Sequence, residues 1–297
     1  MTPVSKGILL RLLGGLLMTG MSACIRIVAQ ELPLGQVMFW RASVALIPIV
    51  IYMALCGDFP RALQTRRPGM HLKRAVFGSF TMVLSFTALA YLPVSSASAL
   101  GYLSPIITLP VAALVLGEHL SRRLVLACLL GFGGVLAMLS GSFTGPEIDQ
   151  GTLIGIGAGL GFAVTVSVTR VHIKEMTRTE FPAAIAFYFA LFTSLIGALS
   201  YFLGWEALDR TLILPLIGAG ILGGMGHICG TEASARAPVS VLAPYDYTGM
   251  IWALAIDMLI FQLVPGAWSL IGVFAITCAG LMIALKRPMR TGTIAQR

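Results

Sequence analysis

The sequence predicts an all-α membrane protein of ten transmembrane helices, arranged as two inverted five-helix repeats with both termini cytoplasmic. Three observations lead to this fold class. First, 57% of the 297 residues are hydrophobic and only 11% are charged, which leaves too little polar surface to cover a water-soluble globule. Second, apolar runs of roughly 17 to 25 residues, the length that crosses a bilayer, recur along the chain. Third, the two halves share a pattern.

The first half contains five of these runs, joined by short connections. The longest connection, from Gly57 to His71, contains Pro60, Pro68 and three arginines, which is typical of a connector rather than of a folded insert. In the fourth run we expect a bend, because Pro105 and Pro110 remove backbone donors in mid-helix. The predicted helices are 7 to 29, 36 to 56, 73 to 92, 94 to 116 and 124 to 140.

The second half contains five further runs. Pro244 predicts a bend in the ninth, at the place that corresponds to the bend in the fourth. Glycines four residues apart predict close helix contacts in the sixth and eighth runs, at Gly155 and Gly159, Gly157 and Gly161, Gly220 and Gly224, and Gly226 and Gly230. The predicted helices are 151 to 172, 182 to 204, 212 to 233, 239 to 261 and 267 to 285.

A repeated motif relates the two halves. Pro93-Val94-Ser95, followed by Tyr102, recurs 145 residues later as Pro238-Val239-Ser240, followed by Tyr247. A shift of 144 also aligns Arg26 with Arg170. We therefore expect repeats at 1–144 and 145–297. Five spans are an odd number, so the second repeat must enter the membrane from the opposite side.

Lysines and arginines predict the orientation. With the N-terminus inside, 17 of the 20 fall on the cytoplasmic side, and only Arg26, Arg41 and Arg210 do not. This distribution accounts for the net charge of +8. Because the cations are divided among short loops instead of clustering on one folded face, we expect no nucleic-acid partner.

Asp246 is the first candidate for a functional group, because charged groups inside spans are costly and tend to face a cavity or a partner. It either bonds a neighbouring arginine or a freed backbone group, or it faces a cavity. Asp257 shares its helix face nearer the outer end, where a structural role is favoured. The repeat-related Tyr102 and Tyr247 would hold an organic ligand between their rings, with Ser98 on the face of Tyr102; the alternative is that both tyrosines are ordinary core residues.

The remaining candidates are aromatic or ionisable. Arg41, next to Trp40, lies about one turn from the outer end, where we expect it to reach the interface. His227 lies deeper and acts either as a neutral donor to a neighbouring helix or as a protonation switch. Tyr245 and Trp252 flank Asp246 along the ninth run. We expect no cofactor and no metal, because the histidines are scattered and the cysteines have no metal-ligand spacing.

Several motifs resemble the ten-span drug/metabolite transporter superfamily with paired EamA-type domains. They are the stretch Pro93–Tyr102, the turn Gly117–Ser121 and the glycine run Gly131–Val135. The second half departs from this pattern, with Gln262-Leu263 in place of the Gly-Glu turn and a lone Gly280. Length and aromatic content are similar to those of YddG-type bacterial exporters of aromatic and other neutral amino acids.

The resemblance implies a secondary transporter of the bacterial inner membrane that works by alternating access. We expect it to be a monomer and to export small amphipathic metabolites, above all amino acids. Proton coupling is left open. A multidrug, nucleoside or vitamin transporter of the same fold is the alternative. A channel would show a filter or a charged ring. An enzyme would need a convergent nucleophile and base, whereas His227 and Glu232 fall on different helix faces. The candidate substrate-binding residues are Tyr102, Tyr247, Asp246, Ser98, His227, Tyr245, Trp40, Arg41 and Trp252.

Overall fold

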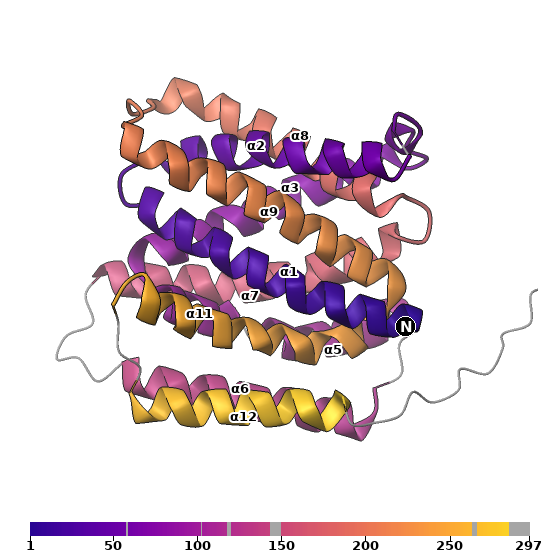
Figure 1. The fold of residues 1–297 in the computed structure, drawn as a ribbon, viewed down its shortest axis with the longest axis vertical. Coiled ribbons are helices and arrows are strands. Elements are labelled where there is room, and N and C mark those ends of the chain that lie inside the picture. Colours follow the sequence, from indigo (N-terminus) through magenta and orange to yellow (C-terminus); the bar gives the residue numbers. More distant parts are fainter. Residues whose placement is uncertain (58, 102, 118–119, 143–149, 263–265, 285–297) are drawn as a thin grey trace, which may run out of the picture.

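The computed structural model describes residues 1–57, 59–101, 103–117, 120–142, 150–262 and 266–284, and within these ranges every regular element is a helix. The long helices run side by side across the view of Figure 1. The described α-helices, long and short, are α1 (Pro3–Val28), α2 (Leu34–Leu55), α3 (Pro68–Tyr91), α4 (Val94–Gly101), α5 (Ser104–Leu116), α6 (Arg122–Ser142), α7 (Gln150–Met176), α8 (Pro182–Leu199), α9 (Arg210–Arg236), α10 (Val239–Leu242), α11 (Thr248–Leu259) and α12 (Ala267–Ala284), with 3₁₀ turns η1 (Arg61–Leu63), η2 (Ser200–Leu203) and η3 (Ala243–Tyr247).

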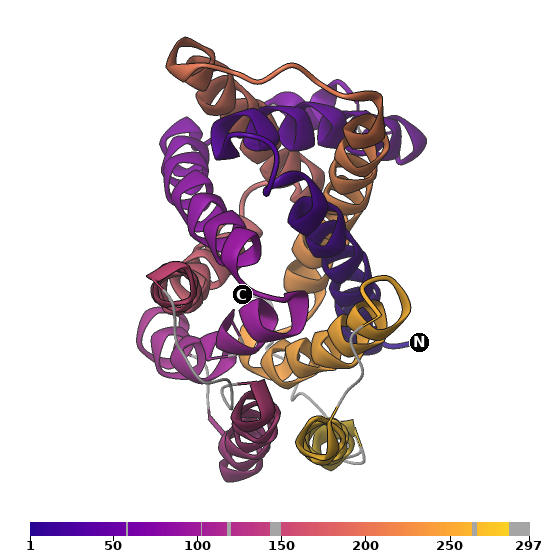
Figure 2. The same ribbon diagram turned by 90° about the vertical axis from the view of Figure 1, so that its left-hand side faces the viewer.

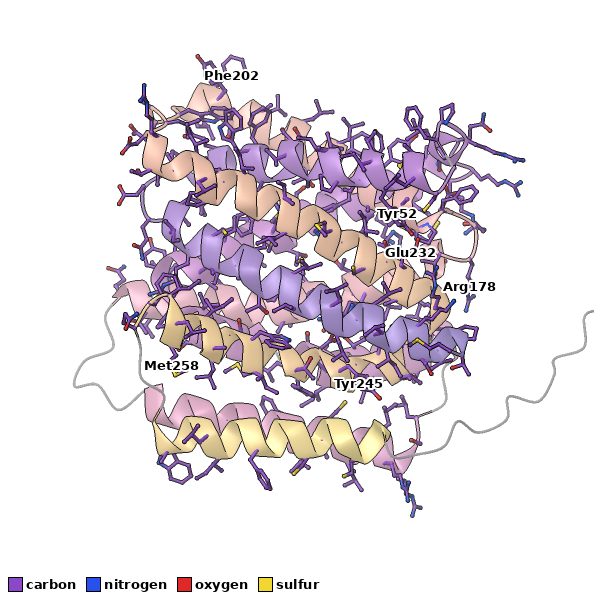
Figure 3. All side chains as sticks on the ribbon, in the orientation of Figure 1. Tyr52, Arg178, Phe202, Glu232, Tyr245 and Met258 are labelled. Carbon is purple, nitrogen blue, oxygen red and sulfur yellow. The ribbon has the colours of Figure 1, made fainter. Side chains whose placement is uncertain are left out.

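Seven of the described helical stretches are long and apolar enough to cross a membrane. Large apolar side chains cover the outside of the bundle (Figure 3), and Phe202, Leu214 and Phe274 are 86%, 77% and 72% exposed. Apolar surface of this extent suits contact with lipid. The seven stretches are Pro3–Val28, Leu34–Leu55, Pro68–Tyr91, Gln150–Met176, Pro182–Leu203, Arg210–Arg236 and Val239–Leu259.

Two of the predicted runs are broken helices. α4 ends at Gly101 and α5 begins at Ser104, with Pro105 in its first turn. In the second half, η3 interrupts the run between α10 and α11, with Pro244 at its start. The bends predicted at Pro105 and Pro244 are therefore confirmed, whereas Pro110 lies inside α5 without ending it. Described helical residues occur in each of the ten predicted ranges, but the number of spans and the inverted relation of the halves stay predictions.

Helices from the two halves of the chain pack on one another. α1 lies along α9, α3 along α7, and α2 against both α8 and α9. Seen along the helices in Figure 2, these elements surround a central region, while α6 and α12 pair with each other at one edge. The largest apolar cluster of the described residues joins α1, α2, α3, α9 and α11, through residues such as Ile25, Val37, Phe86 and Met250. This interleaving places any central space between both halves.

Glycines set the closest helix contacts. A Cβ atom at Gly224 would lie 2.7 Å from the carbonyl oxygen of Ala45, so only glycine lets α9 approach α2 this closely. In α7, a Cβ at Gly155 or Gly159 would lie 2.8 Å from a leucine side chain of the neighbouring segments. The predicted contacts are confirmed at these positions. At Gly157 the prediction is wrong, because this glycine faces open space.

Candidate functional site

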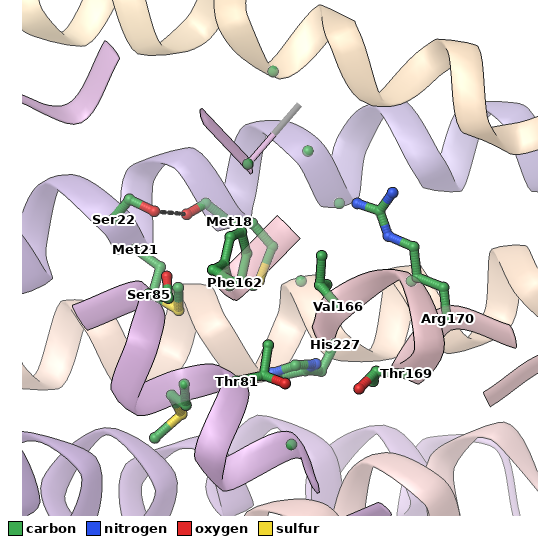
Figure 4. A pocket seen from close by; sticks show the side chains of 18 of the residues that line it. Met18, Met21, Ser22, Thr81, Ser85, Phe162, Val166, Thr169, Arg170 and His227 are labelled. Carbon is green, nitrogen blue, oxygen red and sulfur yellow. Dashed lines mark hydrogen bonds between the residues drawn. The ribbon is translucent and has the colours of Figure 1, made fainter. Parts of the chain in front are cut away.

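A cavity of about 290 Å³ lies among α1, α3, α7 and α9, with smaller contributions from the broken segments and from α2 and α8. This volume is close to the lower end of the range for small-molecule sites, about 300 to 1,000 Å³. Figure 4 shows lining side chains around this space, among them Met18 of α1, Thr81 of α3, Thr169 of α7 and His227 of α9. The walls are mainly apolar, with methionine and phenylalanine side chains, and polar groups lie at a few points.

The polar lining groups follow the helical repeat. On α3, Arg74 is followed by Gly78, Thr81 and Ser85, spaced three or four residues apart, so all four share one face. On α1, Arg11 is likewise followed by Gly15, Thr19 and Ser22. Each of these two helices therefore presents a face of small or polar residues to the cavity, with an arginine toward the end at which the helix begins.

Arg41 is buried, with 1% of its surface exposed, and its guanidinium lies at the cavity wall. Its Nε and Nη2 atoms are 3.4 and 3.3 Å from the sulfur of Met21, and Nη1 is 3.5 Å from the sulfur of Met82. Thioethers are weak acceptors. The expectation that Arg41 reaches the interface is wrong, because α2 packs with this residue turned inward over Gly223 of α9, where a Cβ would lie 2.8 Å from Nη2.

Arg74 is the second buried guanidinium at the cavity, 5% exposed. It lies over the ring of Phe189 at 3.9 Å from the ring centroid, which is the geometry of a cation–π contact. Its Nε and Nη1 atoms have no hydrogen-bond partner among the residues that the structure describes. Gly78, one turn further along α3, leaves room for this guanidinium, because a Cβ there would collide with it.

His227 lies at the same wall of the cavity. Its ring meets Phe189 edge to face, with the ring centroids 5.0 Å apart. Arg41 and Arg74 both act on it electrostatically. Phe189 thus contacts His227 on one side and Arg74 on another, and three nitrogen-rich side chains share one region of the cavity.

Asp246 joins three elements at the end of the cavity nearest the start of α1. From η3 it accepts bonds of 2.5 Å from Arg11 Nε of α1 and from Arg170 Nη1 of α7. Its side chain is 7% exposed, and those of Arg11 and Arg170 are 17% and 21% exposed. Both alternatives for Asp246 hold, since it bonds neighbouring arginines and also lines the cavity. The described lining residues include four arginines and one carboxylate, that of Asp246.

Four of the predicted site residues line the cavity, namely Asp246, Ser98, His227 and Arg41. Tyr102 lies outside the described residues. Tyr247 is fully buried, packs against Gly131 and donates its hydroxyl to the Cys128 carbonyl of α6 at 3.1 Å. The expectation that Tyr247 faces a ligand is therefore wrong, because this ring fills the space that a glycine leaves on a neighbouring helix.

Three further candidates lie away from the cavity lining. Tyr245 is buried in η3. Trp40 packs edge to face on Phe39, with centroids 5.5 Å apart, and Trp252 of α11 is 37% exposed. Sequence reasoning missed Arg11, Arg74 and Arg170, which were counted as loop cations. The signal that could have found them is the row of small and polar residues following Arg11 and Arg74 at helical spacing.

Other charged groups serve the packing at the helix ends. Glu232 forms an ion pair with Arg236, one turn further along α9, and Tyr52 donates to Glu232 at 2.8 Å (Figure 3). Arg26 donates to the carbonyl at the end of α3 and lies over Phe261 at 5.2 Å. Asp257, 2% exposed, acts electrostatically on Arg26, in line with the structural role expected for it.

Comparison with known proteins finds similar transporters. Residues 5–140 match the model of the EamA-like transporter family. The pseudopaline exporter CntI of Pseudomonas aeruginosa is 26% identical over 288 residues, which covers 96% of this chain and 97% of the exporter. The S-adenosylmethionine uptake transporter of Rickettsia prowazekii is 25% identical over 250 residues, covering 82% of this chain and 80% of the relative.

A solved crystal structure has the same fold, with a TM-score of 0.79 at 19% sequence identity, covering 95% of this chain and 97% of the other. The described helices include seven that are apolar and long enough to span a membrane. Together with the match of residues 5–140 and the transporters aligned along most of the chain, these findings support a multi-pass membrane protein whose first half is similar to the EamA-like transporter family.

Proposed function

We propose that the protein is an inner-membrane secondary transporter that exports small amphipathic metabolites, with amino acids as the first class to test. The observation that carries this proposal is the cavity, which both halves of the chain build inside a bundle of apolar helices. Methionine and phenylalanine side chains suit an apolar substituent, while Asp246 and the arginines suit charged groups of both signs. A zwitterionic solute with an apolar side chain matches such a lining.

The relatives support transport of small metabolites without fixing its direction. One is named an exporter and another an uptake transporter. Their named solutes also differ, being pseudopaline and S-adenosylmethionine. The second of these is an amino-acid derivative, which favours amino acids as the starting class for this chain.

Helix packing supports an alternating-access mechanism. If α1 to α3 correspond to α7 to α9, the contact of α1 with α9 is equivalent to that of α3 with α7, and the contact of α2 with α8 is equivalent to itself. Two halves related by a pseudo-two-fold axis would pack in this way. In the proposed cycle, opening at the end where α1 begins separates α1 from η3 and α7, which breaks the bonds of Asp246 with Arg11 and Arg170.

Efflux from liposomes tests the proposal. Purified protein is reconstituted into liposomes loaded with radiolabelled aromatic, branched, basic and acidic amino acids, and release is followed with and without a pH gradient. We expect saturable release of a subset, together with acceleration by unlabelled solute on the far side, which a channel does not give. Recovery of chemically unchanged label excludes turnover by an enzyme. If no amino acid moves above empty liposomes, amino acids are wrong as the substrate class, and nucleosides, vitamins and cationic drugs form the next panel.

A further inference from the structure

We infer that Arg41 and Arg74 form an anion subsite of the cavity, which binds the carboxylate of the transported solute. This inference deepens the proposed function and rests on it, because it assigns one group of the solute to one wall of the cavity. The inference therefore defines the chemical class of the substrate. The solute carries a carboxylate, and an analogue in which that carboxylate is an amide or is missing binds much more weakly.

The first argument is that these two charges are buried without a counter-charge. Among the described residues neither Arg41 nor Arg74 takes part in an ion pair, although both are at least 95% buried. Buried charges in proteins are normally paired, because an unpaired one is costly. Within the described part of the chain, Arg41 has two thioether sulfurs as its hydrogen-bond partners, and two nitrogens of Arg74 have none. An oxyanion between them would supply the acceptors that the protein does not.

The second argument is that the fold holds both guanidiniums in place. Arg74 lies on the Phe189 ring, and Gly78 beneath it has no side chain to displace it. Arg41 lies on the backbone of α9 at Gly223, between the two methionine sulfurs. A guanidinium that was simply tolerated in the core would need no such cradle, whereas a fixed fork of N–H groups is what bidentate binding of a carboxylate requires.

The third argument is the charge balance of the cavity. Asp246 already accepts from Arg11 and Arg170, so its charge is shared by two guanidiniums. Arg41 and Arg74 act on each other electrostatically, and both act on His227. A carboxylate placed here relieves this repulsion, while a solute with only positive charge increases it. The subsite thus favours carboxylates and opposes amines.

Matched pairs of probes test the inference directly. Thermal stabilisation of the purified protein in uncharged detergent is measured with 3-phenylpropionate against 3-phenylpropanamide, and with phenylalanine against phenylalaninamide. Each pair keeps the apolar part and changes only the carboxylate. We expect each carboxylate to raise the melting temperature in a saturable way, with an apparent affinity at least ten-fold higher than that of its amide.

Variants then assign the effect to residues. Arg41→Gln and Arg74→Gln should each weaken carboxylate binding at least ten-fold and remove most of the preference over the amide. Arg26→Gln is the matched control, since Arg26 is also in a helix of the bundle but does not line this cavity. It should keep wild-type binding. Should the Gln variants fail to give a monodisperse peak, the wild-type protein is labelled with phenylglyoxal, and mass spectrometry is expected to show protection of Arg41 and Arg74 by 3-phenylpropionate.

The outcomes separate this inference from the proposed function. Equal binding of a carboxylate and its amide, no binding of any carboxylate, or undiminished binding in both Gln variants overturns the anion subsite, even where the liposomes show efflux. Carboxylate binding that depends on Arg41 and Arg74, in a protein that releases none of the bound compounds from liposomes, supports the subsite and overturns the proposed export of these solutes.

Discussion

Replacing Asp246 by asparagine removes the charge that links α1, η3 and α7 while keeping the size of the side chain. Two charge-assisted bonds are affected, to Arg11 and to Arg170, each 2.5 Å long. Removing one partner of a buried ion pair costs about 3–5 kcal/mol, whereas an exposed pair contributes about 0.2–1 kcal/mol. The arginine side chains are 17% and 21% exposed, which lies between these limits. We therefore expect Asp246→Asn to lower the free energy of unfolding by about 2–4 kcal/mol.

Unfolding in mixed micelles, followed by tryptophan fluorescence as the denaturing detergent increases, measures this change. Asp209→Asn is the control, because Asp209 is an exposed aspartate at the start of α9 that accepts a hydrogen bond of 2.9 Å from the Thr211 hydroxyl, which an asparagine oxygen can also accept. It should alter the free energy by less than about 0.5 kcal/mol. If Asp246→Asn is no more destabilising than this control, the ion-pair network does not hold the three elements together. A second check is the double variant with Arg11→Gln, whose effect should be smaller than the sum of the single effects.

Two further predictions concern packing. Gly224→Ala should lower the free energy of unfolding by about 1–3 kcal/mol, because the new methyl group collides with the Ala45 carbonyl. Gly157→Ala is the control, because Gly157 faces open space, and it should leave the free energy of unfolding unchanged or slightly higher. Equal effects of the two variants would contradict the assigned contact. Tyr247→Phe should lower the free energy of unfolding by about 1 kcal/mol, because it removes the hydrogen bond to the Cys128 carbonyl, and it should leave efflux unchanged. A loss of efflux without a loss of stability would indicate that Tyr247 binds the solute after all.

Several features of the fold could be predicted because they depend on local chemistry. Proline lacks a backbone N–H, so it disrupts a helix that continues through it but fits the first turn of a new helix. The breaks before Pro105 and at Pro244 follow from this property. Glycines four apart mark a face that a neighbouring helix can approach, as α2 does at Gly220 and Gly224. Gly157 shows the limit of this rule, since the spacing does not say whether a neighbour is present.

The rotation of each helix about its own axis could not be predicted. In a helix that is apolar on all sides, the sequence does not distinguish the lipid-facing side from the core-facing side, and packing against distant helices decides between them. Arg41 faces the cavity because α1, α3 and α9 surround that side of α2 through Met21, Met82 and Gly223. None of these contacts is local in sequence.

The arginines of the site were missed for a different reason. Counting cations by side of the membrane predicts an orientation, but it treats every arginine near a helix end as solvated. Arg74 lies in the second turn of α3 and is 5% exposed, so it belongs to the cavity, unlike its exposed neighbour Lys73. The distinguishing signal is the face that follows, with Gly78, Thr81 and Ser85.

The two groups of arginines have different consequences for a transport cycle. Arg11 and Arg170 share Asp246, and these bonds join elements that must separate if the cavity opens at the end where α1 begins, so they stabilise the closed state at that end. A solute shifts this equilibrium only by the difference in its affinity for the two states. Arg41 and Arg74 lie outside this ion pair, and a carboxylate bound to them can remain in place while the bonds of Asp246 break and re-form. Binding and gating would then depend on separate charges, so Asp246→Asn should change the rate of efflux more than the affinity for carboxylates.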